Sequence, residues 1–237
     1  MVSKRKFNWK FGLSAIAIIV VISLFGMFSL YTAANGIRES TRDELKAVAG
    51  VMATQINPSD VTGLKPGDES SLQYKALVEH LQTLRSMDDR IVNAYIMNVS
   101  NNENITFVAD DLYFEDPTGS AKIGDVYITP DQKEIFGALS LPTASQEVYT
   151  DKYGTFISGY APIDTQINGS GGNTVAVLGV DMAATTYTDQ IRATGLAILD
   201  ATLISMIIII AILWAATRNR EDEPEVPEAE RRGWEKD

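Results

Sequence analysis

The side chains that most often carry catalysis or bind metals are sparse in this chain. It has no cysteine and a single histidine, His80. The acidic pairs Asp88-Asp89 and Asp110-Asp111 are adjacent in sequence, so on a strand or loop their side chains diverge. The sequence shows no nucleophile–base pair, no metal-ligand spacing and no phosphate-binding glycine loop. We therefore expect a protein that is not an enzyme, with no catalytic residue, no metal ion and no cofactor.

The chemistry that remains is recognition by aromatic and polar side chains on strands. Residues 155–163 alternate between two faces, which is the period of a strand. The faces carry Phe156, Ser158 and Tyr160 on one side and Ile157, Gly159 and Ala161 on the other. Residues 174–182 form an apolar, β-branched run, and the glycines and Asn168 of residues 168–172 favour a hairpin turn. We expect this hairpin to form the middle of an antiparallel sheet.

The charge of the chain is unevenly distributed, and this argues against one class of partner. The net charge is −11. Residues 38–192 contribute 11 basic and 22 acidic side chains, which accounts for −11 by itself. Affinity for nucleic acid depends on neutralising phosphates with basic side chains. An acidic central domain therefore predicts no nucleic-acid partner.

Two apolar segments flank this central domain. Residues 11–34 lack any charged side chain, and at about 1.5 Å per residue they cover about 36 Å, enough to cross about 30 Å of hydrocarbon. A cleaved signal peptide is the alternative, but its apolar core usually has about 7–15 residues. Residues 193–217 are the second apolar segment, between Arg192 and Arg218.

The basic residues predict the orientation of a two-pass protein of the cell membrane. Lys4, Arg5, Lys6 and Lys10 precede the first segment, and Arg218 and Arg220 follow the second. We therefore expect a cytoplasmic N-terminus (1–10), transmembrane helices at 11–34 and 193–217, an outer domain at 38–192 and a short acidic cytoplasmic tail at 218–237. Because the tail lacks apolar periodicity, we expect a separate protein to receive any signal.

Two helices are expected at the start of the outer domain. The first extends from the membrane to Asn57-Pro58, where proline ends it, and its apolar stripe is Leu45, Val48, Ala49, Met52 and Ile56. The second is expected to be capped by Asp68. Its expected buried face is Leu72, Ala76, Leu77, Leu81, Leu84 and Met87, with His80 half-buried beside it.

Two strands are predicted next, at Ile91–Val99 and Ile105–Asp110. Residues 111–142 then form a long mixed connection with a short helix at Asp131–Leu139, capped near Thr129. A connection of this length is usually a binding lid or a disordered insert. Its aromatic residues argue against disorder, so we expect a lid.

The order of these elements resembles the extracytoplasmic Cache sensor domains, which are PAS-like folds of membrane receptors, in their single-module form. The resemblance lies in Ile91–Asn98, Phe107–Asp110, Gly124–Tyr127, Tyr149–Gly154, Ile157–Ile163 and Val177–Asp181, and covers most of residues 38–192. It implies an α+β fold, in which a PAS-like antiparallel sheet follows a long N-terminal helix and lies between two transmembrane helices in the chain.

The resemblance also implies a site for a small ligand between the sheet and the lid. Its walls would be Tyr95, Met97, Asp110, Tyr127, Tyr149, Phe156, Ser158, Tyr160 and Asp181. Aromatic walls with a few polar groups suit a small molecule, here a carboxylate, an amino acid or an amine. Asp181 is placed to receive a ligand amine.

Two functions follow from this interpretation. The first is an extracytoplasmic small-molecule sensor that passes ligand binding through its transmembrane helices to a separate signalling protein. The second is a structural or assembly protein of the cell surface that uses the PAS-like domain for protein–protein contacts. By analogy with such receptors we expect a homodimer, with Leu45, Val48 and Met52 at its interface.

Overall fold

The computed structural model describes residues 9–100, 104–164 and 174–221. Residues Asn35–Arg192 form one compact unit, and the apolar segments on either side form another. The basic residues before Trp9, the hairpin turn predicted at 168–172 and the acidic tail after Glu221 lie outside the described residues.

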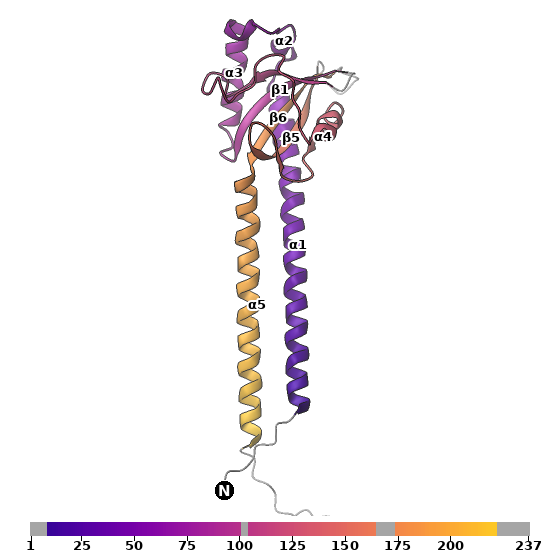
Figure 1. The fold of residues 1–237 in the computed structure, drawn as a ribbon, viewed down its shortest axis with the longest axis vertical. Helices are drawn as coiled ribbons and strands as arrows, with labels where there is room; N and C mark the ends of the chain where they lie inside the picture. The colour runs from indigo at the N-terminus through magenta and orange to yellow at the C-terminus, as the bar shows by residue number, and fades with distance from the viewer. Residues whose placement is uncertain (1–8, 101–103, 165–173, 222–237) are drawn as a thin grey trace, which may run out of the picture. The chain divides into compact units, whose positions relative to one another are not determined.

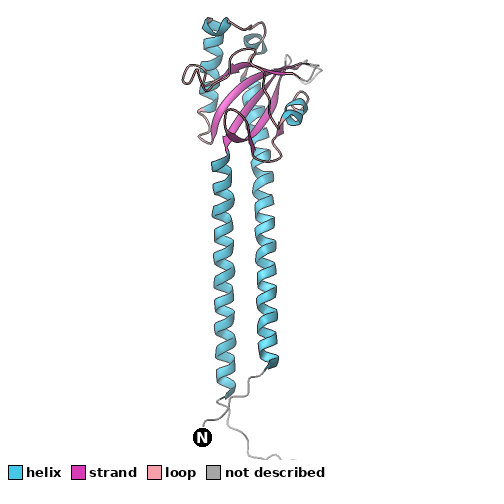
Figure 2. Ribbon diagram, viewed as in Figure 1, coloured by secondary structure: helices cyan, strands magenta, loops and turns pink. Residues whose placement is uncertain are grey.

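The described chain contains long helices at its two ends and a mixed set of short elements between them (Figures 1 and 2). In chain order the elements are α1 (Trp9–Gln55), α2 (Pro58–Val61), the 3-10 turn η1 (Asp68–Ser70), α3 (Leu72–Arg85), β1 (Ile91–Val99), β2 (Ile105–Asp110), α4 (Gln132–Gly137), β3 (Thr143–Ala144), β4 (Tyr149–Thr150), β5 (Thr155–Asp164), β6 (Thr174–Ala183) and α5 (Ala184–Glu221).

The strands form one antiparallel sheet in the order β2-β1-β6-β5-β3, with β4 paired to β5. Strands β1 and β2 have the predicted bounds. The predicted hairpin strands are β5 and β6, and β6 lies in the middle of the sheet, as expected. The predicted fold class, α+β with a PAS-like antiparallel sheet after a long N-terminal helix, is confirmed.

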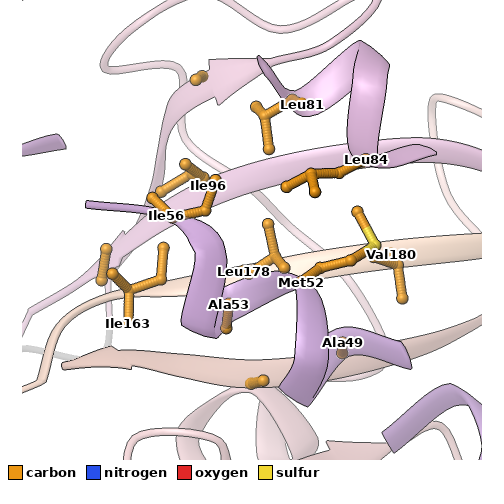
Figure 3. Close-up of a cluster of buried hydrophobic side chains, with 14 of the residues drawn as sticks. Ala49, Met52, Ala53, Ile56, Leu81, Leu84, Ile96, Ile163, Leu178 and Val180 are labelled. Atoms are coloured by element: carbon orange, nitrogen blue, oxygen red, sulfur yellow. The ribbon is translucent and has the colours of Figure 1, made fainter. Parts of the chain in front are cut away.

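One face of the sheet is covered by the C-terminal part of α1 and by α3. Helix α1 contributes its apolar stripe, and the sheet contributes Ile96, Leu178 and Val180 (Figure 3). Full burial of one such side chain contributes about 1.5–3 kcal/mol. The predicted stripe on α1 is confirmed as a core face, but this makes it unsuitable as a dimer interface. Leu45 and Met52 are buried inside the domain, and Val48 is partly buried against the same core.

At Gly159 on β5, helix α1 lies very close to the sheet. A Cβ atom at Gly159 would lie 2.4 Å from the backbone oxygen of Leu45. No side chain fits at that distance, so glycine is required for the helix to pack on the strand. The predicted alternation of β5 is therefore confirmed, since Gly159 faces the helix and Tyr160 lies in the cluster on the other face.

The N-cap of helix α3 lies three residues later than predicted. The N-cap is Ser71, whose hydroxyl accepts a hydrogen bond from the Tyr74 amide, while Asp68 lies in the preceding 3-10 turn. The buried side chains are Tyr74, Leu77, Val78, Leu81 and Leu84. The prediction was wrong for Leu72, Ala76 and Met87, which are exposed, because Tyr74 and Val78 rotate the buried face away from them.

The opposite face of the sheet is covered by part of the lid, residues 111–142, whose first aromatic residues, Tyr113 and Phe114, instead contact Tyr74 of α3. The cluster on this face includes Phe107 and Tyr160 from the sheet and Tyr127, Ile135 and Ala138 from the lid. The short helix in the lid is α4, which is shorter at both ends than predicted. The N-cap is Asp131 and makes no side-chain capping hydrogen bond, so the predicted cap near Thr129 lies two residues too early; Thr129 Oγ1 accepts a hydrogen bond from the Asp131 amide.

The end helices have the composition expected for membrane spans. The segments Gly12–Gln55 and Ala184–Ala215 are long and apolar enough to cross a membrane, with mean hydropathies of 2.6 and 2.7 in their most apolar windows. Within this unit, a Cβ atom at Gly26 would lie 2.9 Å from Thr202 Oγ1. A small residue at such a point lets two apolar helices approach closely.

Candidate functional site

A cavity of about 370 Å³ lies on the lid side of the sheet. It is bounded by strands β1, β2, β5 and β6 and by the lid and the turn after β4. The lining residues are Val92, Asn93, Tyr95, Phe107, Asp110, Leu112, Asp116, Gly119, Tyr127, Lys152, Tyr153, Phe156 and Asp181. Its volume is within the range of about 300–1,000 Å³ that is typical of small-molecule sites.

The structure divides the nine predicted site residues into two groups. Five line the cavity: Tyr95, Asp110, Tyr127, Phe156 and Asp181. The other four, Met97, Tyr149, Ser158 and Tyr160, are buried and are not part of its wall. The expectation that these four line the pocket is therefore corrected. Their strands do carry them on the lid side, but neighbouring side chains cover them.

Aromatic rings form much of the cavity wall. The ring centres of Phe107 and Tyr127 are 4.8 Å apart, and Phe107 lies 5.6 Å from Tyr95 and 5.5 Å from Tyr153. These tilted and edge-to-face arrangements are the favoured geometries of aromatic pairs. The sequence analysis did not place Phe107 or Tyr153 in the site. The alternation of β2 could have indicated the face of Phe107, because Phe107 and Ile105 are two residues apart and therefore lie on the same face of the strand.

Asp181 is the most deeply buried acidic side chain of the cavity wall. It is 3% exposed, and its Oδ1 accepts hydrogen bonds from the Tyr95 hydroxyl at 2.9 Å and the Ser158 hydroxyl at 2.6 Å. Burial raises the pKa of Asp181 to about 7, because removal from water disfavours the charged carboxylate. This carboxyl group can therefore change its charge near neutral pH.

Three hydroxyl groups continue from Asp181 into the interior. Ser158 Oγ lies 2.8 Å from the Tyr149 hydroxyl, which lies 3.2 Å from the Tyr160 hydroxyl. Tyr160 donates a 3.0 Å hydrogen bond to Asp131 Oδ2, which also accepts from Ser145. Burial raises the pKa of Asp131 to about 6. We call Ser158, Tyr149 and Tyr160 the hydroxyl chain.

Asp131 and Ser145 belong to this network but were not predicted as site residues. Asp131 was expected only at the start of a short helix, and in the structure it is the N-cap of α4. Nothing in the local sequence indicated that the side chain of Asp131 is directed to the sheet instead of to the helix.

The remaining acidic groups near the cavity hold loops in place. Asp110 accepts hydrogen bonds from the amides of Leu112 and Ala121, which fixes both ends of one loop of the lid. Burial raises the pKa of Asp110. Asp116 accepts from Thr118 and from the Gly119 amide. Both oxygens of Asp110 are thus occupied by backbone amides, whereas the hydrogen bonds to Asp116 and to Asp181 end on Oδ1.

Two groups at the edge of the cavity complete its charge pattern. Tyr127 donates a 2.7 Å hydrogen bond to Asp151 in the turn between β4 and β5. Lys152 follows directly, and its Nζ lies 4.6 Å from the centre of the Tyr153 ring. Among the described lining residues Lys152 is the one basic side chain, against the carboxyl groups of Asp110, Asp116 and Asp181. The lining therefore favours a ligand with positive charge.

A second hollow of about 240 Å³ lies near the end of α1, next to His80. His80 is exposed, not half-buried as expected, and its Nε2 lies 3.2 Å from the backbone oxygen of Gln55. Gln73 donates to the backbone oxygens of Ser59 and Asp60. These contacts join α3 to α2 and to the end of α1. In the described ranges, no group of three or more His, Cys, Asp or Glu side chains is placed to hold a metal ion.

Comparison with known proteins gives little further information. No protein-family model matches the chain, and no curated protein matches it. Among solved structures, it is similar to the periplasmic domain of RsbU from Chlamydia trachomatis, with 12% identity and a TM-score of 0.40. The alignment covers 77% of this chain and 56% of that one, so the chain spans little more than half of that protein's length. A similarity of this extent does not transfer a function.

Proposed function

We propose that residues 35–192 are an extracytoplasmic sensor domain of the Cache type, which binds a small molecule in the cavity beneath the lid. The observation that carries this proposal is the cavity itself. It combines aromatic walls with a buried carboxyl group, Asp181, at which a polar ligand group can be fixed. Sites with apolar walls and a few convergent polar groups are typical of small-molecule recognition. The protein acts by binding, without catalysis.

The charges of the wall favour an amine or an amino acid over a simple carboxylate. Both side-chain hydrogen bonds to Asp181 end on Oδ1, so a ligand ammonium group would be received on the Oδ2 side. Tyr95 and Tyr127 also line the cavity, and the faces of aromatic rings attract a cation. Lys152 at the edge would attract a carboxylate, if the ligand carries one.

The connection to the membrane is short in sequence. Strand β6 ends at Ala183 and α5 begins at Ala184, with no linker between them. Asp181 lies on the same strand, so a ligand that shifts β6 acts on the start of a membrane helix directly. We propose that this shift is passed through the helices to a separate signalling protein in the cytoplasm, where both termini lie. A ligand shifts such an equilibrium only by its difference in affinity for the two states.

We also propose a homodimer, with the exposed side of α1 as its interface. The core side of α1 is occupied by the domain itself. Ala47, Val51 and Thr54 are exposed on the other side of the same helix.

Thermal unfolding of the full chain in detergent micelles, with a panel of amines, amino acids and carboxylates, tests the sensor function. A ligand at about 100 times its dissociation constant stabilises by about 2.7 kcal/mol, which is a shift of several degrees for a domain of this size. We expect such a shift with a cationic member, in the wild type and in Asp89→Asn, an exposed control. We expect none in Asp181→Asn.

The panel also separates the sensor from the surface-assembly function. An assembly protein would show no shift with any member of the panel and would instead form a stable complex with another surface protein. If a ligand shifts the unfolding temperature of Asp181→Asn as much as that of the wild type, the protein is still a sensor, but Asp181 is not part of its binding site.

A further inference from the structure

Asp181 and Asp131 are the two ends of one continuous row of oxygen atoms. From Asp181 Oδ1 the distances are 2.6 Å to Ser158, 2.8 Å on to Tyr149, 3.2 Å on to Tyr160 and 3.0 Å on to Asp131 Oδ2. All four are hydrogen-bond distances, and all five side chains are buried. A buried contact between two oxygens without a proton between them is unfavourable, because nothing offsets their repulsion.

The number of protons in this row can be counted. Each hydroxyl group carries one proton and an ionised carboxylate carries none. The hydroxyl chain therefore supplies three protons for four contacts. Among the described residues the neighbours do not supply a fourth. Tyr95 donates to Asp181 and Ser145 to Asp131, and Tyr127, whose hydroxyl lies 3.4 Å from that of Tyr149, donates to Asp151. If both carboxyl groups are ionised, one contact in the row is left without a proton.

We propose that Asp131 and Asp181 hold a single proton between them, which moves from one to the other along the hydroxyl chain. With the proton on Asp131, this carboxyl group donates to Tyr160, Tyr160 to Tyr149, Tyr149 to Ser158 and Ser158 to Asp181. In the transfer each proton crosses one contact, so four O–H bonds break and four form. The result is Asp181 protonated and Asp131 ionised, with no change in total charge.

The charged groups around the pair favour one retained proton. Carboxylates lie near both ends of the row and raise the pKa of each end. Asp110 and Asp151 raise the pKa of Asp181, and Glu134 and Asp151 raise that of Asp131. Lys152 faces the cavity at one end, and Arg42 of α1 donates to the backbone oxygen of Ser145 at the other. Burial and this acidic surrounding disfavour ionisation of both carboxyl groups at once, so one proton is retained, as the geometry requires. Two carboxyl groups coupled in this way titrate as a pair.

The shared proton gives the cavity a link to the lid. A ligand cation that binds at Asp181 stabilises the ionised form there and moves the proton to Asp131, next to α4. This consequence rests on the proposed function, whereas the proton count does not depend on any ligand.

The proton number of unfolding tests the proposal without a ligand. Between about pH 4 and pH 7 the folded pair holds one proton that the unfolded chain has released, so the unfolding constant rises about tenfold per pH unit from this pair. Guanidinium unfolding of the full chain in detergent micelles is followed by tyrosine circular dichroism at a series of pH values. Other buried carboxyl groups contribute equally to all variants, so differences between variants are compared.

Asp131→Asn and Asp181→Asn are each expected to lose this tenfold dependence, because the side-chain amide replaces the protonated acid as a donor. In the double variant the pH dependence of the unfolding constant is expected to decrease by no more than in either single variant, since only one proton is shared. If the pH dependence of the unfolding constant decreased by about a hundredfold per pH unit in the double variant, the two carboxyl groups would hold two separate protons. If it were unchanged in both single variants, the pair would hold no proton. Either result overturns the proposal.

A second pair of variants tests the path. Tyr149→Phe divides the row into two parts, each with one contact and one hydroxyl proton, so the extra proton is no longer required. We expect it to lose the same tenfold dependence, whereas Tyr74→Phe, in the core on the other face of the sheet, retains it. A merely structural role of Tyr149 would lower stability equally at every pH. The wild type must also show the infrared C=O stretch of a protonated carboxyl group at neutral pH, and its absence would contradict the proposal even if a variant fails to fold.

Discussion

Ser158 and Asp181 are direct cross-strand partners on β5 and β6, and the serine hydroxyl donates a 2.6 Å hydrogen bond to the aspartate. The pairing fixes the position of a carboxyl group on the cavity wall and connects the same carboxyl group to the hydroxyl chain behind it. One side of Asp181 thus faces the space for a ligand, and the other faces the interior of the domain. The predictions below follow from this position.

Binding of a cationic amine is expected to depend on pH through Asp181. Its pKa is about 7, so the pair takes up its shared proton as the pH falls through this value, and a cation at Asp181 must then displace the proton to Asp131. We expect the affinity to fall as the pH is lowered through about 7 and then to level off, because the pair retains the displaced proton. Titration calorimetry of the full chain at several pH values measures this. An affinity that is the same on both sides of about pH 7 would exclude Asp181 as the cation site.

Ser158→Ala is expected to shift this pH dependence upward. The Ser158 hydrogen bond lowers the pKa of Asp181 against the larger effect of burial, so its loss raises the pKa further. We also expect a loss of stability of about 1–3 kcal/mol from the unpaired groups. Thr155→Ala, at the exposed end of the same strand, is the control and should change neither property. An unchanged pH profile in Ser158→Ala would contradict the role of this hydrogen bond.

Gly159→Ala is expected to destabilise the domain by about 1–3 kcal/mol. The new Cβ atom would lie 2.4 Å from the Leu45 backbone oxygen, so α1 and β5 must move apart. Gly36→Ala on α1 is the matched control, since no atom lies within 4 Å of its Cβ position. That change should stabilise, by up to about 1 kcal/mol, because alanine favours helix. Guanidinium unfolding measures the change in the free energy of unfolding of both variants. Equal changes would contradict the close packing of α1 on β5 at Gly159.

Single cysteines in this cysteine-free chain test the dimer interface. Val51 is 61% exposed and Met52 is 5% exposed. If the exposed side of α1 forms the interface, Val51→Cys should form a disulfide-linked dimer in membranes on oxidation, and Met52→Cys should not. Efficient cross-linking through Met52→Cys alone would instead support the interface first expected from the sequence.

The strands were predictable from the sequence because their patterns are strong. Alternation and turn residues placed β1 and β2 at their observed bounds, and the same alternation assigned Ser158 and Tyr160 to the lid side. The face of α3 was less predictable. Its apolar residues fit more than one stripe, and only the tertiary contacts of Tyr74 and Val78 decide which of them is buried.

The candidate site was predictable only in part, for a physical reason. A strand pattern indicates the face on which a side chain lies, but not the depth at which neighbours cover it. Tyr95 and Asp181 therefore line the cavity, while Tyr149 and Tyr160 lie beneath its wall. Lys152, Tyr153 and Asp131 come from a turn and from the lid, where no periodicity relates the sequence to the position of a side chain.

The most direct test of the account is titration calorimetry of the full chain in lipid nanodiscs with the cationic ligand that gives the largest thermal shift. We predict saturable binding with one site per chain in the wild type and in Asp89→Asn. Asp181→Asn should weaken it by at least about tenfold, which corresponds to about 1.4 kcal/mol. Equal binding in all three proteins, or no binding of any cationic ligand to the wild type, would contradict the claim that the cavity beside Asp181 is a ligand site.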